Sequence, residues 1–133
     1  TKTPNNTLIV DAYNANPTSM KASLENFGQL KMESKFLILG DMLELGDDSQ
    51  QEHERIIKLA VEVGASKIFL VGKEFSCAYN TLVEQKQITA SDIMLFNNST
   101  TLREYLQQNH VKGYNILLKG SHGIHLERLL DVL

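Results

Sequence analysis

The chain has 133 residues, 42% of them hydrophobic, and a formal net charge of −3 at pH 7. This length suits one domain with its own core, and the weakly acidic balance argues against a nucleic-acid or polybasic membrane surface. The single cysteine, Cys77, excludes an internal disulfide framework and suits a reducing compartment. No apolar run approaches the roughly 20 residues of a membrane span, and no signal-peptide pattern is present.

The two ends of the sequence indicate a piece of a longer protein. The chain starts with Thr1 rather than Met, and it ends within an apolar helical pattern at Leu133. The polar segment Thr1–Asn6 contains Pro4 and predicts an interdomain linker, with the hinge of the protein in it. Residues 7–133 are then the domain itself.

Five apolar runs alternate with five helical patterns along the chain. Strands are predicted where the run is short and apolar, and helices where apolar residues recur every three or four positions. The predicted elements are, in chain order, strand Thr7–Ala12, helix Pro17–Lys31, strand Lys35–Gly40, helix Ser49–Val63, strand Lys67–Val71, helix Phe75–Glu84, strand Asp92–Phe96, a helix from Thr101, strand Asn115–Lys119 and a helix from about His122.

The ends and faces of these helices can also be predicted. Asn16 suits the N-cap of the first helix, and capping boxes are predicted at Ser49–Glu52 and Thr101–Glu104. Gly64 is the expected C-terminal stop of the second helix, and His53 is expected to be exposed. The side chains expected to face inward are Met20, Leu24, Phe27, Ile56, Ile57, Ala60, Val61, Cys77, Ala78 and Leu82.

This alternation predicts an α/β fold: a three-layer, Rossmann-like domain whose mostly parallel sheet of five to six strands has helices on both faces. Right-handed crossovers place all the strand-to-helix turns along one edge of the sheet, where ligands bind in open α/β folds. The strand order stays open, although both common doubly wound orders put the first strand inside the sheet.

Three of these turns carry unusual chemistry. Asp11, after the first strand, suits ribose hydroxyls, a metal ion or an ammonium group, and this reading is favoured over a turn aspartate that bonds local backbone N–H groups. Asn16 is explained by capping, and Tyr13 suits either stacking on a base or packing on the first helix. Asn14 lies in the same turn.

The second and third turns add charge and apolar surface. Asp41 and Glu44 lie in a loop whose apolar residues either fold onto their own helices or contact a neighbouring domain. Lys119 and Ser121 would make a carboxylate or phosphate pocket, although a strand-end lysine can also simply reach solvent. His122 and the nearby His125 have no metal-ligand partner at a suitable spacing, so solvated positions are expected.

Several motifs are missing from the sequence. It has no G-x-x-x-x-G-K-[ST] phosphate loop, no G-x-G-x-x-G after the first strand, no G-x-S-x-G elbow and no Cys/His metal cluster. The chain has no complete catalytic set, so an enzyme role requires another domain.

Taken together, residues 11–20 (D-A-Y-N-A-N-P-T-S-M), 39–46 (L-G-D-M-L-E-L-G) and 118–121 (L-K-G-S) resemble the C-terminal domain of the Mur ligases. The likeness covers essentially the whole chain. Within the family, it is greatest to the member that adds D-alanyl-D-alanine to UDP-N-acetylmuramoyl-tripeptide. The Asp-Asn-Pro-Arg signature for diaminopimelate selection in the preceding ligase is missing, which favours the dipeptide as acceptor.

The resemblance implies a three-domain, ATP-dependent amide ligase of cytoplasmic peptidoglycan precursor synthesis. The N-terminal domain would hold the UDP-sugar, and the central domain would carry the phosphate loop, most of the magnesium coordination and a carbamylated lysine. The C-terminal domain would close over ATP and the incoming dipeptide, and it would be inactive alone. The peptide carboxylate is phosphorylated, and the amine then attacks the acyl phosphate.

The resemblance also implies roles for individual residues of this chain. None of these residues is expected to bind a metal ion. The ATP-binding residues would be Asp11, Tyr13, Asn14 and Asn16, the dipeptide-binding residues Lys119, Ser121 and His122, and the interdomain residues Asp41 and Glu44. His122 stands where some relatives have Arg, and at neutral pH it is a weaker carboxylate partner.

Two alternatives stay open beside this reading, and a third is rejected. Another Mur-type amino-acid ligase and a stand-alone nucleotide- or peptide-binding module both fit the same edge. A signalling receiver domain fits less well, since Val71-Gly72-Lys73 offers no phosphoacceptor aspartate after the third strand.

Overall fold

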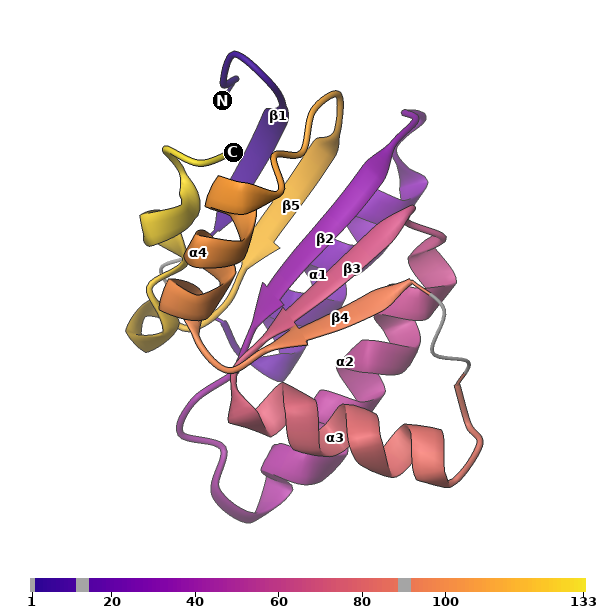
Figure 1. The fold of residues 1–133 in the computed structure, drawn as a ribbon. Coiled ribbons are helices and arrows are strands. Elements are labelled where there is room, and N and C mark those ends of the chain that lie inside the picture. The colour runs from indigo at the N-terminus through magenta and orange to yellow at the C-terminus, as the bar shows by residue number, and fades with distance from the viewer. Residues whose placement is uncertain (1, 12–14, 89–91) are drawn as a thin grey trace.

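A computed structural model of the chain describes residues 2–11, 15–88 and 92–133, and its centre is a five-stranded parallel sheet (Figure 1). All five predicted strands are present, with ends within one residue of the prediction. The strands are β1 (Thr7–Asp11), β2 (Lys35–Gly40), β3 (Lys67–Val71), β4 (Ile93–Phe96) and β5 (Asn115–Lys119). Their order across the sheet is β1-β5-β2-β3-β4.

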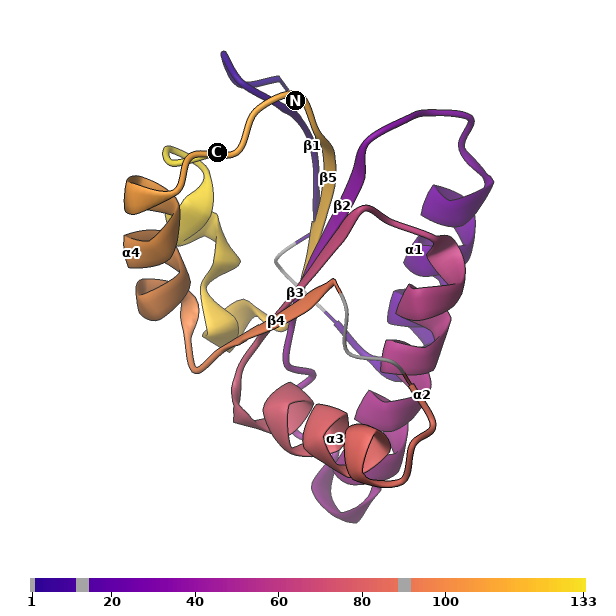
Figure 2. The same cartoon turned by 45° about the vertical axis from the view of Figure 1, so that its right-hand side comes forward.

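Helices cover both faces of the sheet, which confirms the three-layer prediction (Figure 2). One face packs against α1 (Pro17–Gln29), α2 (Ser49–Val63) and α3 (Lys73–Glu84). The other face packs against α4 (Ser99–Gln108) and against the C-terminal segment, residues 122–133. Strand β2 serves both cores, because Leu37 and Leu39 point to one face while Phe36 and Ile38 point to the other.

The prediction that the first strand lies inside the sheet was wrong. Strand β5 pairs with both β1 and β2, so β1 is an edge strand. The side chains reflect this position: Ile9 and Val10 are exposed, whereas Ile116, Leu117 and Leu118 of β5 are buried. Strand β5, whose middle residues are all apolar, therefore takes the interior position between β1 and β2.

Helix α1 ends two residues earlier and α3 begins two residues earlier than predicted, and neither predicted capping box forms. Ser49 makes no capping box; Asp48 precedes α2 without a side-chain cap, and Ser49 Oγ donates instead to Glu74. Helix α4 begins earlier than predicted, because the side chain of Asn98 accepts from the backbone N–H of Thr101. The predicted stop of α2 is confirmed, with Gly64 in the left-handed conformation.

The last predicted helix is not an α-helix. Residues His122–Ile124 and Leu126–Leu129 form two short 3₁₀ segments, interrupted by His125 with φ of 60°. A left-handed residue cannot continue a right-handed helix. Leu126 and Leu129 nevertheless pack into the core beside α4.

Two side chains expected to face inward are exposed, Val61 and Cys77. Each lies next to an inward position on its helix, Ala60 and Ala78 respectively. Successive side chains on an α-helix point about 100° apart around its axis, so the neighbour of an inward residue can face solvent. The other residues expected inward are buried.

The N-terminal segment predicted as a linker is bonded to the far end of the chain. Asn6 is buried, and its side chain donates to the carbonyl oxygens of Val111 and Leu133. Thr3 Oγ1 also donates to the Leu133 carbonyl, at 2.8 Å. Within the described residues, no helix is long and apolar enough to span a membrane.

Candidate functional site

The carboxyl ends of β1 and β5 bring an acid and a base together. Asp11 and Lys119 are register partners in these neighbouring strands, and Lys119 Nζ donates to Asp11 Oδ2. The Lys119 side chain is 1% exposed, while the Asp11 side chain is 47% exposed. The prediction that these residues share one edge of the sheet is confirmed. The pair presents its carboxylate to solvent and keeps its ammonium group inside.

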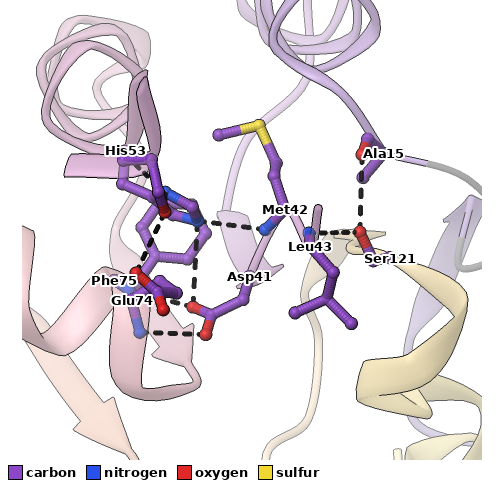
Figure 3. Close-up of polar contacts among 9 residues, drawn as sticks. Ala15, Asp41, Met42, Leu43, His53, Glu74, Phe75 and Ser121 are labelled. Carbon is purple, nitrogen blue, oxygen red and sulfur yellow. Dashed lines mark hydrogen bonds and ion pairs between the residues drawn. The ribbon is translucent and has the colours of Figure 1, made fainter. Parts of the chain in front are cut away.

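Ser121 joins the three turns of this edge (Figure 3). Its hydroxyl accepts from the backbone N–H of Leu43 at 2.9 Å and lies 3.4 Å from the carbonyl of Ala15, to which it donates. Its own N–H donates to the carbonyl of Asp41 at 3.1 Å. The side chain predicted to bind substrate therefore also ties together the loops that follow β1, β2 and β5.

The turns can approach this closely because glycines meet where β2 and β5 end. A Cβ on Gly120 would lie 2.8 Å from the Cα of Gly40, closer than real Cβ atoms come to backbone. No larger residue fits at Gly120 without separating the two strands.

Asp41 is buried and caps α3. Its two carboxylate oxygens accept from the backbone N–H groups of Glu74 and Phe75, each at 2.9 Å (Figure 3). Burial raises the pKa of Asp41 above its usual value, and the two backbone N–H bonds oppose that change. The carboxylate predicted to face another domain thus points into its own domain.

Glu44 lies at the exposed tip of the same loop, residues 41–45, and has a φ of 67°. A non-glycine residue in this left-handed region has an unfavourable backbone conformation. It persists only where contacts with its surroundings compensate for that cost. Leu43 beside it is also exposed. The loop therefore presents an acidic and an apolar side chain to solvent.

His53 was expected to be exposed, and the structure buries it completely, with 0% exposure. Its Nε2 accepts from the backbone N–H of Met42 at 3.0 Å (Figure 3). Its Nδ1 donates to the carbonyl of Ser49 at 2.7 Å. The helical spacing in the sequence indicates this burial. His53 precedes the buried Ile56 and Ile57 by three and four residues, which places it on the same inward face of α2.

Asn16 is the N-cap of α1, as predicted. Its side chain accepts from the N–H of Ser19 at 2.9 Å, and Ser19 Oγ accepts from the N–H of Asn16 at 3.1 Å. An open groove of about 770 Å³ lies beside this cap. It is lined by Asn16, Pro17, Thr18, Ser19, Ala22, Leu45, Asp48, Glu52 and Arg55.

The remaining predicted residues divide into two groups. Tyr13 and Asn14 lie outside the described residues, so their predicted nucleotide contacts stay predictions. His122 is exposed on the C-terminal segment, with its ring 5.7 Å from that of His125, whose Nδ1 lies 3.0 Å from a carboxylate oxygen of Glu127. Across residues 2–11, 15–88 and 92–133, no group of three or more His, Cys, Asp or Glu side chains is arranged to hold a metal ion.

Comparison with known proteins identifies the family of the chain. A family profile described as "Mur ligase, glutamate ligase domain" matches residues 1–122. The UDP-N-acetylmuramoyl-tripeptide–D-alanyl-D-alanine ligase of Rickettsia prowazekii is 36% identical over 129 residues, which are 96% of this chain and 27% of that protein. The chain therefore spans about a quarter of the length of this curated relative.

Solved structures give the same result. Crystal structure I of MurF from Acinetobacter baumannii superimposes with a TM-score of 0.71 at 31% identity, covering 93% of this chain and 26% of that one. The MurF ligase of Thermotoga maritima, solved in complex with ADP, gives a TM-score of 0.73 over 99% of this chain and 29% of its own, and its 22% identity carries the fold alone. The chain therefore belongs to the Mur ligase family, whose C-terminal domain it represents.

Proposed function

We propose that the chain serves an ATP-dependent ligase that adds D-alanyl-D-alanine to UDP-N-acetylmuramoyl-tripeptide in the cytoplasm. The names of the curated relatives support this activity, and the share of their length that the chain covers leaves room for central and N-terminal domains as its partners. The observation that carries the site is the pairing of exposed Asp11 with buried Lys119 beside the Ser121 turn.

The chemistry needs charge neutralisation and positioning. ATP phosphorylates the tripeptide carboxylate, and the amine of the dipeptide attacks the carbonyl carbon of the acyl phosphate, so that phosphate leaves as the amide bond forms. Asp11, which is exposed, is suited to accept hydrogen bonds from the ribose hydroxyls of ATP. Lys119 is suited to bind the dipeptide carboxylate, which needs a cation.

Ligand binding at this edge competes with a bond that already exists. The Lys119 ammonium group donates to Asp11 in the free domain. A dipeptide carboxylate and a ribose would each take one partner of this pair, so closure of the domain exchanges an internal ion pair for contacts with ligands. This exchange keeps the buried ammonium group paired before and after binding.

Magnesium is proposed to lie with the ATP phosphates on the central domain. The described part of this chain has no cluster of three ligating side chains, and its exposed carboxylate at the edge suits hydroxyl groups. The roles of Glu44 in the domain interface, and of Tyr13, Asn14 and His122 in ligand contacts, belong to the same proposal.

The test is D-alanyl-D-alanine-dependent phosphate release by the full-length ligase. We expect Asp11→Asn to raise KM for ATP and Lys119→Met to raise KM for the dipeptide. Each change should be about 10- to 100-fold, the usual effect of losing a hydrogen bond to a charged group. The matched controls are Asp47→Asn and Lys112→Met, which change the same residue types at exposed positions away from the Asp11–Lys119 pair.

Unchanged kinetic constants in both Asp11→Asn and Lys119→Met would overturn the site assignment. The 133-residue chain alone should release no phosphate from ATP with the tripeptide and dipeptide present, because its sequence has no phosphate loop. Phosphate release by the chain alone would contradict the proposal that catalysis requires the central domain.

A further inference from the structure

The buried His53 uses both ring nitrogens, and neither bond was expected from the sequence. Nδ1 faces the Ser49 carbonyl, which can only accept, so Nδ1 carries the proton. Nε2 faces the Met42 N–H, which can only donate, so Nε2 is the unprotonated acceptor. The two bonds therefore select one tautomer, with the donor at Nδ1 and the acceptor at Nε2.

This site suits a neutral imidazole and few other groups. The ring of Phe75 packs edge-on at 4.6 Å between centroids, and the His53 side chain is fully buried. One small side chain must offer an acceptor to Met42 and a donor to Ser49 from the same plane. A lysine has no acceptor, a carboxylate has no donor, and an aliphatic side chain leaves a buried N–H unpaired.

His53 is one of three attachments that fix the loop over residues 41–45. The others are the Asp41 carboxylate on α3 and the Ser121 hydroxyl on the Leu43 N–H (Figure 3). The attachments hold three consecutive residues, and the next one is Glu44, with its unfavourable φ of 67°. Such a conformation persists only when its surroundings fix it, so the attachments determine where Leu43 and Glu44 point.

We propose that His53 is a positioning residue, which acts through the Met42 backbone to hold Leu43 and Glu44 in the orientation that meets the rest of the ligase when the domain closes. This role rests on the proposed function. His53 does not touch ligand, since it is wholly buried under the loop. Its contribution is a loop whose conformation is set before closure.

The first experiment uses the 133-residue chain and needs no enzyme activity. Long-range ¹H–¹⁵N spectra should give His53 protonated at Nδ1 only, and the Met42 amide should exchange slowly with solvent. His53→Leu should speed exchange of the Met42 and Leu43 amides about tenfold or more. His53→Gln should restore part of the protection, because its amide oxygen can stand near the Nε2 position.

The matched control is Ile56→Val, a buried change on the same face of α2 that touches none of the loop bonds. It should leave the Met42 and Leu43 amides protected. A His53 ring protonated at Nε2, or equal exchange in His53→Leu and Ile56→Val, would overturn the positioning role.

The second experiment measures turnover by the full-length ligase. His53→Leu should lower kcat about 10- to 100-fold, as expected for a displaced loop, with the dissociation constant of the UDP-linked tripeptide unchanged. His53→Gln should recover part of kcat. Normal kcat in a His53→Leu enzyme whose loop amides exchange faster would refute the role, whereas a wild-type protein without ligase activity would refute the proposed function instead.

Discussion

At the level of single residues, the close contact between Asp41 and Gly72 fixes the turn that joins the end of β3 to the start of α3. Gly72 has a φ of 121°, and a Cβ there would lie 2.3 Å from the carboxyl carbon of Asp41. Glycine is needed both for this backbone conformation and for the space that the capping carboxylate occupies.

Gly72→Ala should therefore lower the free energy of unfolding by about 2–4 kcal/mol, through backbone strain and a displaced cap. Gly46→Ala is the matched control, because Gly46 also has a positive φ, 59°, but has open space where a Cβ would be. The control should cost only about 1–2 kcal/mol. Urea denaturation measures both, and equal losses would mean that the contact with Asp41 carries no energy.

The sequence predicted some of these residues and missed others for physical reasons. Asp11 and Lys119 could be placed at one edge, because parallel strands bring their carboxyl ends together whatever their order. Asp41 could not be assigned its cap, because its partners lie 33 and 34 residues away and depend on β2 and β3 being neighbours. The burial of His53 was not predicted because histidine is a polar residue type that usually lies at the surface, although its spacing places it on the apolar face of α2.

At the scale of the element, the C-terminal segment stabilises the face of the sheet that carries α4. Its apolar spacing predicts an α-helix, and the left-handed His125 divides it into two 3₁₀ turns. Leu126 and Leu129 stay buried all the same. Of the apolar residues Ile124, Leu129 and Leu130 in that pattern, only Leu129 is buried, so the spacing identified the buried side chains only in part. The backbone conformation depended on one residue, His125, whose φ the spacing does not reveal.

Leu129→Ala should cost about 2–4 kcal/mol of unfolding free energy, because it removes buried methyl groups and leaves a cavity. Leu130→Ala, at the neighbouring exposed position, should cost less than about 1 kcal/mol. Thermal or urea unfolding separates the two. Similar losses for both would show that the segment does not pack as described.

An ion pair joins α4 to this segment. Arg103 Nη1 donates to Asp131 Oδ1, its Nη2 donates to Asp131 Oδ2 at 2.9 Å, and the hydrogen bonds lower the pKa of Asp131 below its usual value. A carboxyl group whose pKa is lower in the folded state adds stability above its unfolded pKa of 3.8 and loses it as pH falls through the folded pKa.

Wild-type protein should consequently be more stable than Asp131→Asn at pH 6, and the difference should disappear as the pH falls below about 3.8. Because the pair is exposed, added salt should also reduce the difference. Unfolding titrations from pH 2 to 7, at low and high salt, measure both effects. A difference that stays constant with pH would contradict the assigned pairing.

At the scale of the whole molecule, Asn6 joins the N-terminal segment to Val111 and to Leu133, which are more than 100 residues away along the chain. Its side chain donates to the carbonyls of Val111 and Leu133 and accepts from the N–H of Tyr114 at 3.0 Å. The alternation of strand and helix patterns along the sequence predicted the three layers of this fold. It could not predict these bonds, because they depend on β1 lying at the edge beside β5.

Asn6→Ala should lower the unfolding free energy by about 1–3 kcal/mol, since it leaves buried polar groups without their partner. Asn5→Ala is the control, because Asn5 contributes a backbone carbonyl to Gly113 that the substitution keeps. The two variants can be compared by urea denaturation. Equal stability of Asn6→Ala and wild type would mean that water replaces all three bonds.

The position of β5 between β1 and β2 has a consequence for synthesis of the chain. Strands β1 and β2 each pair with β5, and the bonded residues Asp11 and Lys119 are 108 positions apart. As the polypeptide leaves the ribosome, β2 can join β3 and β4 early, but β1 has no neighbour until almost the whole domain has emerged. A nascent chain stopped before Asn115 would hold an apolar strand with nowhere to dock, which is the state that chaperones recognise.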